Sequence, residues 1–69
     1  MVILYSNGCT NCKALKKRLD ALEIVYEEVN DMEVFKEKGF DFMPNLEIDG
    51  KIYSFIESIK LINRGELNV

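Results

Sequence analysis

The sequence predicts an α/β domain in which a four-stranded mixed sheet is flanked by three helices, in the order β-α-β-α-β-β-α. Short runs of β-forming residues alternate with a segment of helical spacing, which is typical of two parallel strands joined by a crossover helix. Asp49-Gly50 separates two further short strands and indicates a tight hairpin, so these strands should be antiparallel. The chain has 69 residues, and we expect residues 1–69 to form a single domain.

The first strand and the first helix have clear patterns. Val2 to Tyr5 is a continuous apolar run, which fits a strand covered on both faces. Ser6-Asn7-Gly8 then interrupts the run with three turn-forming residues. From Thr10 to about Leu22 the apolar residues recur every three or four positions, which predicts a helix with one buried face. The residues expected on that face are Cys12, Leu15, Leu19 and Leu22.

The middle of the chain predicts a second strand and a short helix. Ile24 to Val29 contains good β-formers and should pair in parallel with the first strand. Met32 to about Lys38 follows as a helix, capped by Asn30 or Asp31 and ended by Gly39.

The last third predicts the hairpin and a final helix. Leu46 and Ile48 alternate with polar neighbours, as in a half-buried strand, and Ile52-Tyr53 begins the returning strand. Ser54 and Glu57 match a capping box, so we expect a helix to begin there. The buried stripe of this helix should consist of Phe55, Ile59 and Ile62.

Composition limits the kinds of function. The net charge is -3 and no basic patch is visible, which disfavours nucleic-acid binding. No apolar run reaches the roughly 20 residues of a membrane span, and the segment Met1 to Tyr5 lacks the basic region of a signal peptide. The two cysteines are too few for the disulfide framework of a small secreted domain, so we expect a cytoplasmic protein. Histidine is absent, which leaves the thiols as the chemical groups to consider.

The motif that indicates chemistry is Cys9-Thr10-Asn11-Cys12, at the junction of the first strand and the first helix. Free N–H groups and a partial positive charge at a helix N-terminus favour a thiolate and lower its pKa from about 8.5. We therefore expect Cys9 to be the attacking thiolate. Cys12 lies one turn further into the helix, so we expect it to be more buried, less ionised and able to resolve a mixed disulfide.

Other interpretations of the two cysteines stay open at this point. The pair can be incidental, a passive disulfide, or part of an adaptor domain with silent thiols. It can also be half of a zinc site, which would need ligands from carboxylates or a second chain. A two-chain iron–sulfur or metal carrier that uses Cys9 is the main alternative function.

Met43-Pro44 is the second notable feature. A proline just before a strand can be an ordinary edge-strand start or turn. Alternatively, a cis proline beside the thiols would direct the backbone N–H and C=O of Met43 toward an extended substrate, which could bind like an added strand.

Together these segments resemble a glutaredoxin. The resemblance lies in Val2–Ser6, Cys9–Cys12, Met43–Asn45 and Glu47–Lys51, whose order and spacing match over nearly the whole chain. The short length is similar to that of small glutaredoxin-like redoxins, including those that supply electrons to ribonucleotide reductase. The resemblance implies a thioredoxin fold, a cis bond before Pro44 and dithiol redox activity.

Three departures from the glutaredoxin pattern bear on glutathione. Thr10 stands where the family usually has proline, and Ser6 stands where a lysine or arginine meets a glutathione carboxylate. Tyr53-Ser54 replaces a glycine pair, and Tyr53 is expected to crowd the site. Ser54 and the first N–H groups of the last helix can still hold a carboxylate or amide, although Ser54 and Glu57 can equally form a cap alone. We expect no glutathione-dependent turnover.

The predicted protein is therefore a dithiol thiol–disulfide oxidoreductase, an electron carrier that reduces protein or glutathione-mixed disulfides. The predicted catalytic residues are Cys9 and Cys12, and the predicted substrate-binding residues are Met43, Pro44, Tyr5, Ser54 and Thr10. No metal or bound cofactor is expected, and glutathione is considered as a reductant or substrate. Expected partners are a disulfide-containing protein, with ribonucleotide reductase as one candidate, and either glutathione or a thioredoxin-reductase-type flavoprotein as reductant. We expect a monomer that binds neither nucleic acid nor membrane.

Two aromatic features have a packing interpretation beside the functional one. Tyr5 can flank the thiols, as the family's active-site aromatic residue does, or pack in the core. Phe40 and Phe42 can form an apolar lip beside Cys9, but core packing is the favoured interpretation.

Overall fold

The computed structural model describes residues 1–65. Its elements follow the predicted order. They are β1 (Val2–Tyr5), α1 (Thr10–Ala21), β2 (Glu27–Val29), α2 (Met32–Lys38), β3 (Asn45–Ile48), β4 (Lys51–Ser54) and α3 (Phe55–Asn63).

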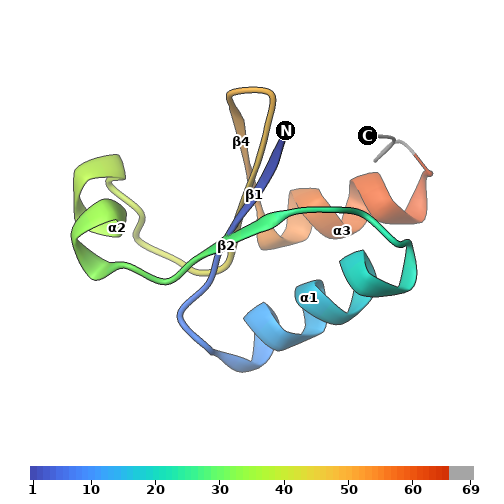
Figure 1. Ribbon diagram of the computed structural model, residues 1–69, viewed down its shortest axis with the longest axis horizontal. Coiled ribbons are helices and arrows are strands. Elements are labelled where there is room, and N and C mark those ends of the chain that lie inside the picture. The colour runs from blue at the N-terminus through green and yellow to red at the C-terminus, as the bar shows by residue number, and fades with distance from the viewer. Residues whose placement is uncertain (66–69) are drawn as a thin grey trace.

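The four strands form one mixed sheet in the order β2-β1-β3-β4 (Figure 1). β1 pairs in parallel with β2 and antiparallel with β3, where Tyr5 lies opposite Asn45. β3 and β4 form the predicted antiparallel hairpin, and both turn residues, Asp49 and Gly50, have positive φ angles. This arrangement brings the C-terminal end of β1 and the N-terminal end of β3 to the same edge of the sheet.

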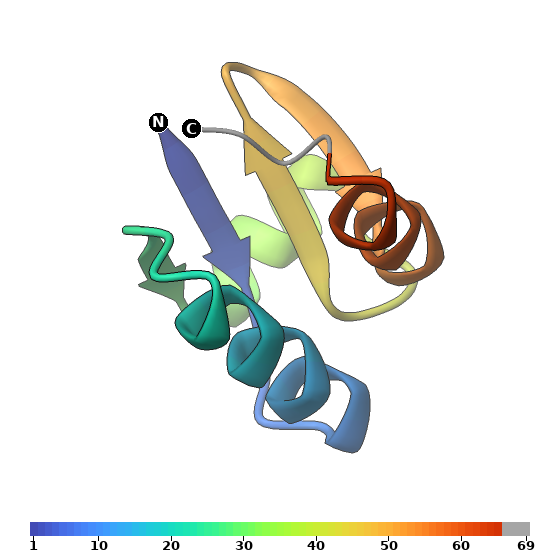
Figure 2. The ribbon, with the colours of Figure 1, turned by 90° about the vertical axis from the view of Figure 1, so that its right-hand side faces the viewer.

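Helices cover both faces of the sheet (Figure 2). α1 and α3 lie side by side on one face, and α2 lies on the other. The main core lies between the sheet and α1, and the apolar residues of α3 pack against it. Its buried members are Val2, Leu4, Leu15, Leu19 and Leu46.

The first helix ends one residue earlier than the pattern predicts. Leu22 is its C-cap and is 49% exposed, so the expectation that Leu22 lies on the buried face is wrong. Glu23 has a φ of 58°, and the N–H of Ile24 donates to the carbonyl of Leu19, which turns the chain away from the helix axis. The second strand is also shorter than predicted, and Val25 before it is 90% exposed.

The predicted caps are confirmed. The Asp31 carboxylate accepts the N–H of Glu33 at the start of α2, and Gly39 ends that helix in the left-handed conformation. At α3 the hydroxyl of Ser54 accepts the N–H of Glu57, whose carboxylate accepts the N–H of Ser54. No helix within residues 1–65 is long and apolar enough to cross a membrane.

Candidate active site

Cys9 is the N-cap of α1, at the position that the sequence predicts for the attacking thiol. Gly8, with a φ of 82°, completes the turn from β1, and Cys9 has an extended backbone. The Sγ of Cys9 accepts a hydrogen bond from the backbone N–H of Cys12 at 3.2 Å. Cys9 is partly exposed, so its sulfur is open to a substrate while it faces the free donors of the helix N-terminus.

Cys12 lies behind Cys9 and is only 1% exposed. Its thiol donates to the side-chain oxygen of Asn7 at 3.4 Å, and the same oxygen accepts the backbone N–H of Cys9 at 3.2 Å. The two cysteines are not joined by a disulfide. The expected contrast between an accessible Cys9 and a buried Cys12 is confirmed.

The two thiols ionise as a pair because their side chains are hydrogen-bonded. Desolvation by burial, together with the adjoining Cys12 thiol, raises the pKa of Cys9 above its usual value. Burial also opposes ionisation of Cys12, but hydrogen bonds with Cys9, the Asn7 backbone and the Ser6 side chain bring the pKa of Cys12 below its usual value. The expectations that Cys9 has the lowered pKa and that Cys12 is the less ionised thiol are therefore wrong. Exposure, rather than a lowered pKa, distinguishes Cys9 from the buried Cys12.

Met43 and Pro44 lie directly beside the thiols. The Met43–Pro44 peptide bond is cis, as the family resemblance implies. The carbonyl oxygen of Met43 is 3.9 Å from the Sγ of Cys9. Asn45 holds this loop from within, because its side-chain amide donates to the carbonyl of Phe42 at 2.6 Å.

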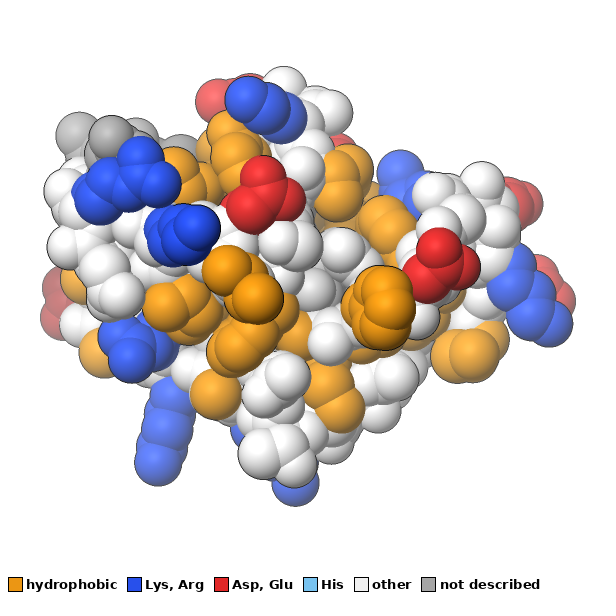
Figure 3. All heavy atoms as spheres, turned by 180° about the vertical axis from the view of Figure 1, so that it is seen from behind, with side chains coloured by type: hydrophobic (Ala, Val, Ile, Leu, Met, Phe, Trp, Pro, Cys, Tyr) orange, Lys and Arg blue, Asp and Glu red, His pale blue; other side chains and the backbone are white. Residues whose placement is uncertain are grey.

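A hollow of about 290 Å³ opens next to this loop. It is lined by Asn11, Phe42, Met43, Pro44, Asn45, Ser54, Phe55 and Ile56. The structure therefore brings three of the predicted substrate-binding residues together, namely Met43, Pro44 and Ser54. The rim is apolar, since Phe42 is 84% exposed and Ile56 is 64% exposed. In Figure 3 hydrophobic side chains gather near the middle of the face, between charged side chains at both ends.

Tyr5 and Thr10 lie outside this hollow. Tyr5 is buried under α2, where its ring packs against Phe35 and Phe40, and its hydroxyl donates to Glu47 at 2.9 Å. These contacts give Tyr5 a packing role. Thr10 is exposed on the outer side of α1, next to Cys9.

The residues at the departures from the glutaredoxin pattern have specific places. Ser6 is 4% exposed, and its hydroxyl accepts the N–H of Gly8, so it presents no charge to a ligand. Tyr53 packs against the core and lines a separate hollow near Glu57. The expectation that Tyr53 crowds the site beside Pro44 is therefore wrong. In β4 the side chains alternate between the faces of the sheet, and Tyr53 lies opposite the buried Leu46.

The sequence does not identify several residues of the site, namely Asn7, Asn11, Asn45, Phe55 and Ile56. The sequence predicts Asn7 only as a turn residue, although its place two residues before Cys9 suits an Asx turn, in which its side chain accepts the Cys9 N–H. Asn11 and Ile56 line the hollow because α1 and α3 begin beside each other, a proximity that depends on the tertiary structure. Within residues 1–65, no group of three or more cysteine, aspartate or glutamate side chains could hold a metal ion.

A comparison with solved structures supports this architecture. No protein-family model matches the chain, and no curated protein matches it. Among solved structures, the chain is similar to the glutaredoxin-like protein NrdH-redoxin from Escherichia coli, whose structure is described as the basis of a thioredoxin-like activity profile. The identity is 23%, the TM-score is 0.74, and the match covers 99% of this chain and 95% of the other. The chain therefore has the thioredoxin fold, in the form found in a glutaredoxin-like redoxin.

Proposed function

We propose that this protein is a dithiol thiol–disulfide oxidoreductase in which Cys9 attacks a substrate disulfide and Cys12 resolves the product. The observation that supports this proposal most directly is the position of Cys9. Its partly exposed sulfur accepts the Cys12 N–H at 3.2 Å and lies 3.9 Å from the carbonyl of Met43, with a second, buried thiol behind it.

The reaction has two exchanges. The Cys9 thiolate attacks one sulfur of the substrate, forms a mixed disulfide and releases the other sulfur as a thiolate. The Cys12 thiol then loses its proton to solvent and attacks the Cys9 sulfur. This step forms the Cys9–Cys12 disulfide and releases the second substrate thiolate. Two electrons pass to the substrate, and an external reductant must return two electrons to the protein.

The loop before β3 is suited to hold the substrate. The Met43 backbone lies next to the attacking sulfur, so an extended segment can lie along it as a short added strand. The exposed rings and aliphatic groups of Phe42 and Ile56 favour an apolar side chain near the disulfide. This arrangement suits a protein disulfide better than glutathione, since buried Ser6 presents no cation to a glutathione carboxylate.

We further propose a cytoplasmic protein that is recycled by a thioredoxin-reductase-type flavoprotein, with ribonucleotide reductase as a candidate target. Coupled assays with NADPH and either that flavoprotein or glutathione with its reductase would test the choice. We expect turnover with the flavoprotein only. Turnover in the assay with glutathione and its reductase, without turnover in the flavoprotein assay, would overturn this part of the proposal.

A single-turnover experiment with the small disulfide 5,5′-dithiobis(2-nitrobenzoate) tests the chemistry. The reduced protein should release two coloured thiolates and end as an internal disulfide. Cys12→Ser should release one and keep the other as a mixed disulfide, while Cys9→Ser should react at least about a hundredfold more slowly because its remaining thiol is buried. Rapid release of two thiolates by Cys9→Ser would refute the assignment. A brown anaerobic preparation with stoichiometric iron would favour the two-chain carrier instead.

A further inference from the structure

Charge is distributed very unevenly between α1 and the rest of the protein. The helix carries four basic residues and one acidic residue, whereas the remaining chain carries five basic and eleven acidic residues. A positively charged helix therefore begins immediately after Cys9 on a protein whose net charge is -3.

Of the four cations on α1, only Lys16 forms an ion pair within residues 1–65, and Lys13 and Lys17 have no hydrogen-bond acceptor there either. Lys16 pairs with Glu28 at 2.9 Å, and Arg18 donates to the side chain of Asn63 at 3.5 Å. Lys13 and Lys17 are exposed, and neither forms an ion pair within the described part of the chain. Their charges are available to a partner.

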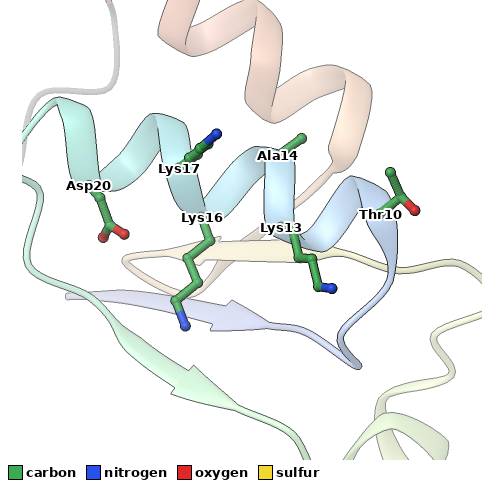
Figure 4. Close-up of a pocket in the computed structure, with 6 residues that line it drawn as sticks. All are labelled: Thr10, Lys13, Ala14, Lys16, Lys17 and Asp20. Atoms are coloured by element: carbon green, nitrogen blue, oxygen red, sulfur yellow. The ribbon is translucent and has the colours of Figure 1, made fainter.

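Lys13 and Lys17 lie on the outward side of the helix, opposite the buried Leu15 and Leu19. A hollow of about 520 Å³ runs along this side of the helix (Figure 4). Its lining includes Thr10 and Ala14 as well as three lysines, so it offers methyl groups and aliphatic stems with ammonium groups at their ends. Asp20 is its one acidic member, and the Asp20 carboxylate accepts the hydroxyl of Tyr26 at 3.0 Å. Lys17 is eight residues beyond Cys9, or about 12 Å along a helix axis. A protein whose disulfide meets Cys9 would therefore cover this surface as well.

We propose that Thr10, Lys13, Ala14 and Lys17, the α1 basic face, dock an acidic segment of the protein substrate next to its disulfide. This inference rests on the proposed redox function and specifies that the protein substrate carries negative charge next to its disulfide. Phe42 and Ile56 bound the neighbouring hollow with apolar groups, so charge selection comes from the α1 side of Cys9. Complementary charge accelerates association by tenfold or more at low salt. At physiological salt the attraction between exposed charges is screened over about 8 Å.

Three synthetic peptides test the proposal. Each has one cysteine joined by a disulfide to 2-nitro-5-thiobenzoate, flanked on both sides by aspartates, serines or lysines. Reduced protein converts each peptide disulfide to a peptide thiol and a coloured thiolate, and itself becomes the Cys9–Cys12 disulfide. Rates are measured by stopped flow under single-turnover conditions. They are divided by the rate of the same peptide with dithiothreitol, which corrects for intrinsic reactivity.

We expect the aspartate peptide to react about tenfold faster than the serine peptide at low salt, with the ratio approaching one at high salt. This expectation opposes the net charge, since a uniformly acidic protein would repel that peptide. Equal rates, or a faster lysine peptide, would overturn the docking proposal. If no peptide releases the coloured thiolate, the proposed redox function itself fails.

Matched charge reversals locate the effect. The double variant Lys13→Glu/Lys17→Glu should lose the preference for the aspartate peptide and keep the wild-type rate with the serine peptide to within about twofold. The control Lys36→Glu/Lys60→Glu changes the net charge equally on α2 and α3 and should keep the preference. An equal loss of preference in both variants would assign the effect to net charge and overturn the proposal.

Discussion

The side-chain oxygen of Asn7 lies 3.4 Å from the Sγ of Cys12, and it also accepts the backbone N–H of Cys9. One amide oxygen thus contacts both the thiol of Cys12 and the backbone of Cys9, the residues to which we assign the resolving and attacking roles. Asn7→Asp would place a negative charge beside the two thiols, so the pKa values of both should rise. Alkylation by iodoacetamide at pH 7 should slow about tenfold.

The matched control is Asn7→Ser, whose hydroxyl can form a similar turn without adding charge. Its pH profile of alkylation should stay close to that of the wild type. If Asn7→Asp left the pH profile unchanged, the amide would have no influence on the thiols.

Coupled ionisation of the thiols predicts a two-step titration. Because the pKa of Cys12 is lowered and that of Cys9 is raised, alkylation should increase in one step below the usual thiol pKa and in another above it. Cys12→Ser should show a single step, and mass spectrometry of the wild type should find Cys9 labelled first. Earlier labelling of Cys12 would contradict the structure.

Two leucines of the same helix should differ strongly in their effect on stability. Leu19 is completely buried, so Leu19→Ala should lower the free energy of unfolding by about 2–5 kcal/mol. Leu22 is 49% exposed, and Leu22→Ala should change it by less than about 1 kcal/mol. Urea denaturation followed by circular dichroism measures both. Similar losses would mean that Leu22 is buried after all.

The apolar rim of the hollow should affect substrate recognition without affecting stability. Phe42→Ser removes an 84% exposed ring, so the free energy of unfolding should change by less than about 0.5 kcal/mol. For a peptide disulfide with a neighbouring leucine, kcat/KM should fall about fivefold, because the lost contact is worth about 1 kcal/mol. Met32→Ser, which alters an exposed methionine on α2, is the control. An equal fall in both variants would exclude a specific role for Phe42.

Tyr26 should be unusually resistant to ionisation. Burial and a hydrogen bond to Asp20 at 3.0 Å raise the pKa of Tyr26 to about 12. The unfolded chain ionises near pH 10, so the native protein should lose stability as pH rises from about 10 toward 12. Asp20→Asn should lower the pKa of Tyr26 toward 10 in an ultraviolet titration. A Tyr26 pKa that did not change in that variant would show that burial alone is responsible.

Local patterns predicted much of the fold and the centre of the site. The order of elements, the caps at Asp31 and Ser54, and the placement of Cys9 and Cys12 at the start of a helix all follow from short-range chemistry. These features depend on neighbours within a few residues, which the sequence displays directly.

The remaining features depend on contacts between distant segments. Phe40 and Phe42 have the same local pattern, yet Phe40 packs against Tyr5 and Phe42 faces solvent. The shared ionisation of the thiols likewise depends on side-chain orientation rather than on their spacing.

The pairing of Tyr5 with Asn45 gives the two central strands a further role, because their register sets the distance between Cys9 and Met43. Cys9 is carried by the chain leaving β1, and Met43 by the chain entering β3. A slip of one residue between these strands would shift the Cys9 sulfur relative to the Met43 carbonyl by about 3.3 Å, the rise per residue of a strand, and so break their contact. The same slip would turn Leu4 or Leu46 out of the core. Burial of two leucines far from the thiols therefore helps to set the distance between the Cys9 sulfur and the Met43 carbonyl, so a core substitution that shifts the register can impair the exchange reaction without changing any residue of the site.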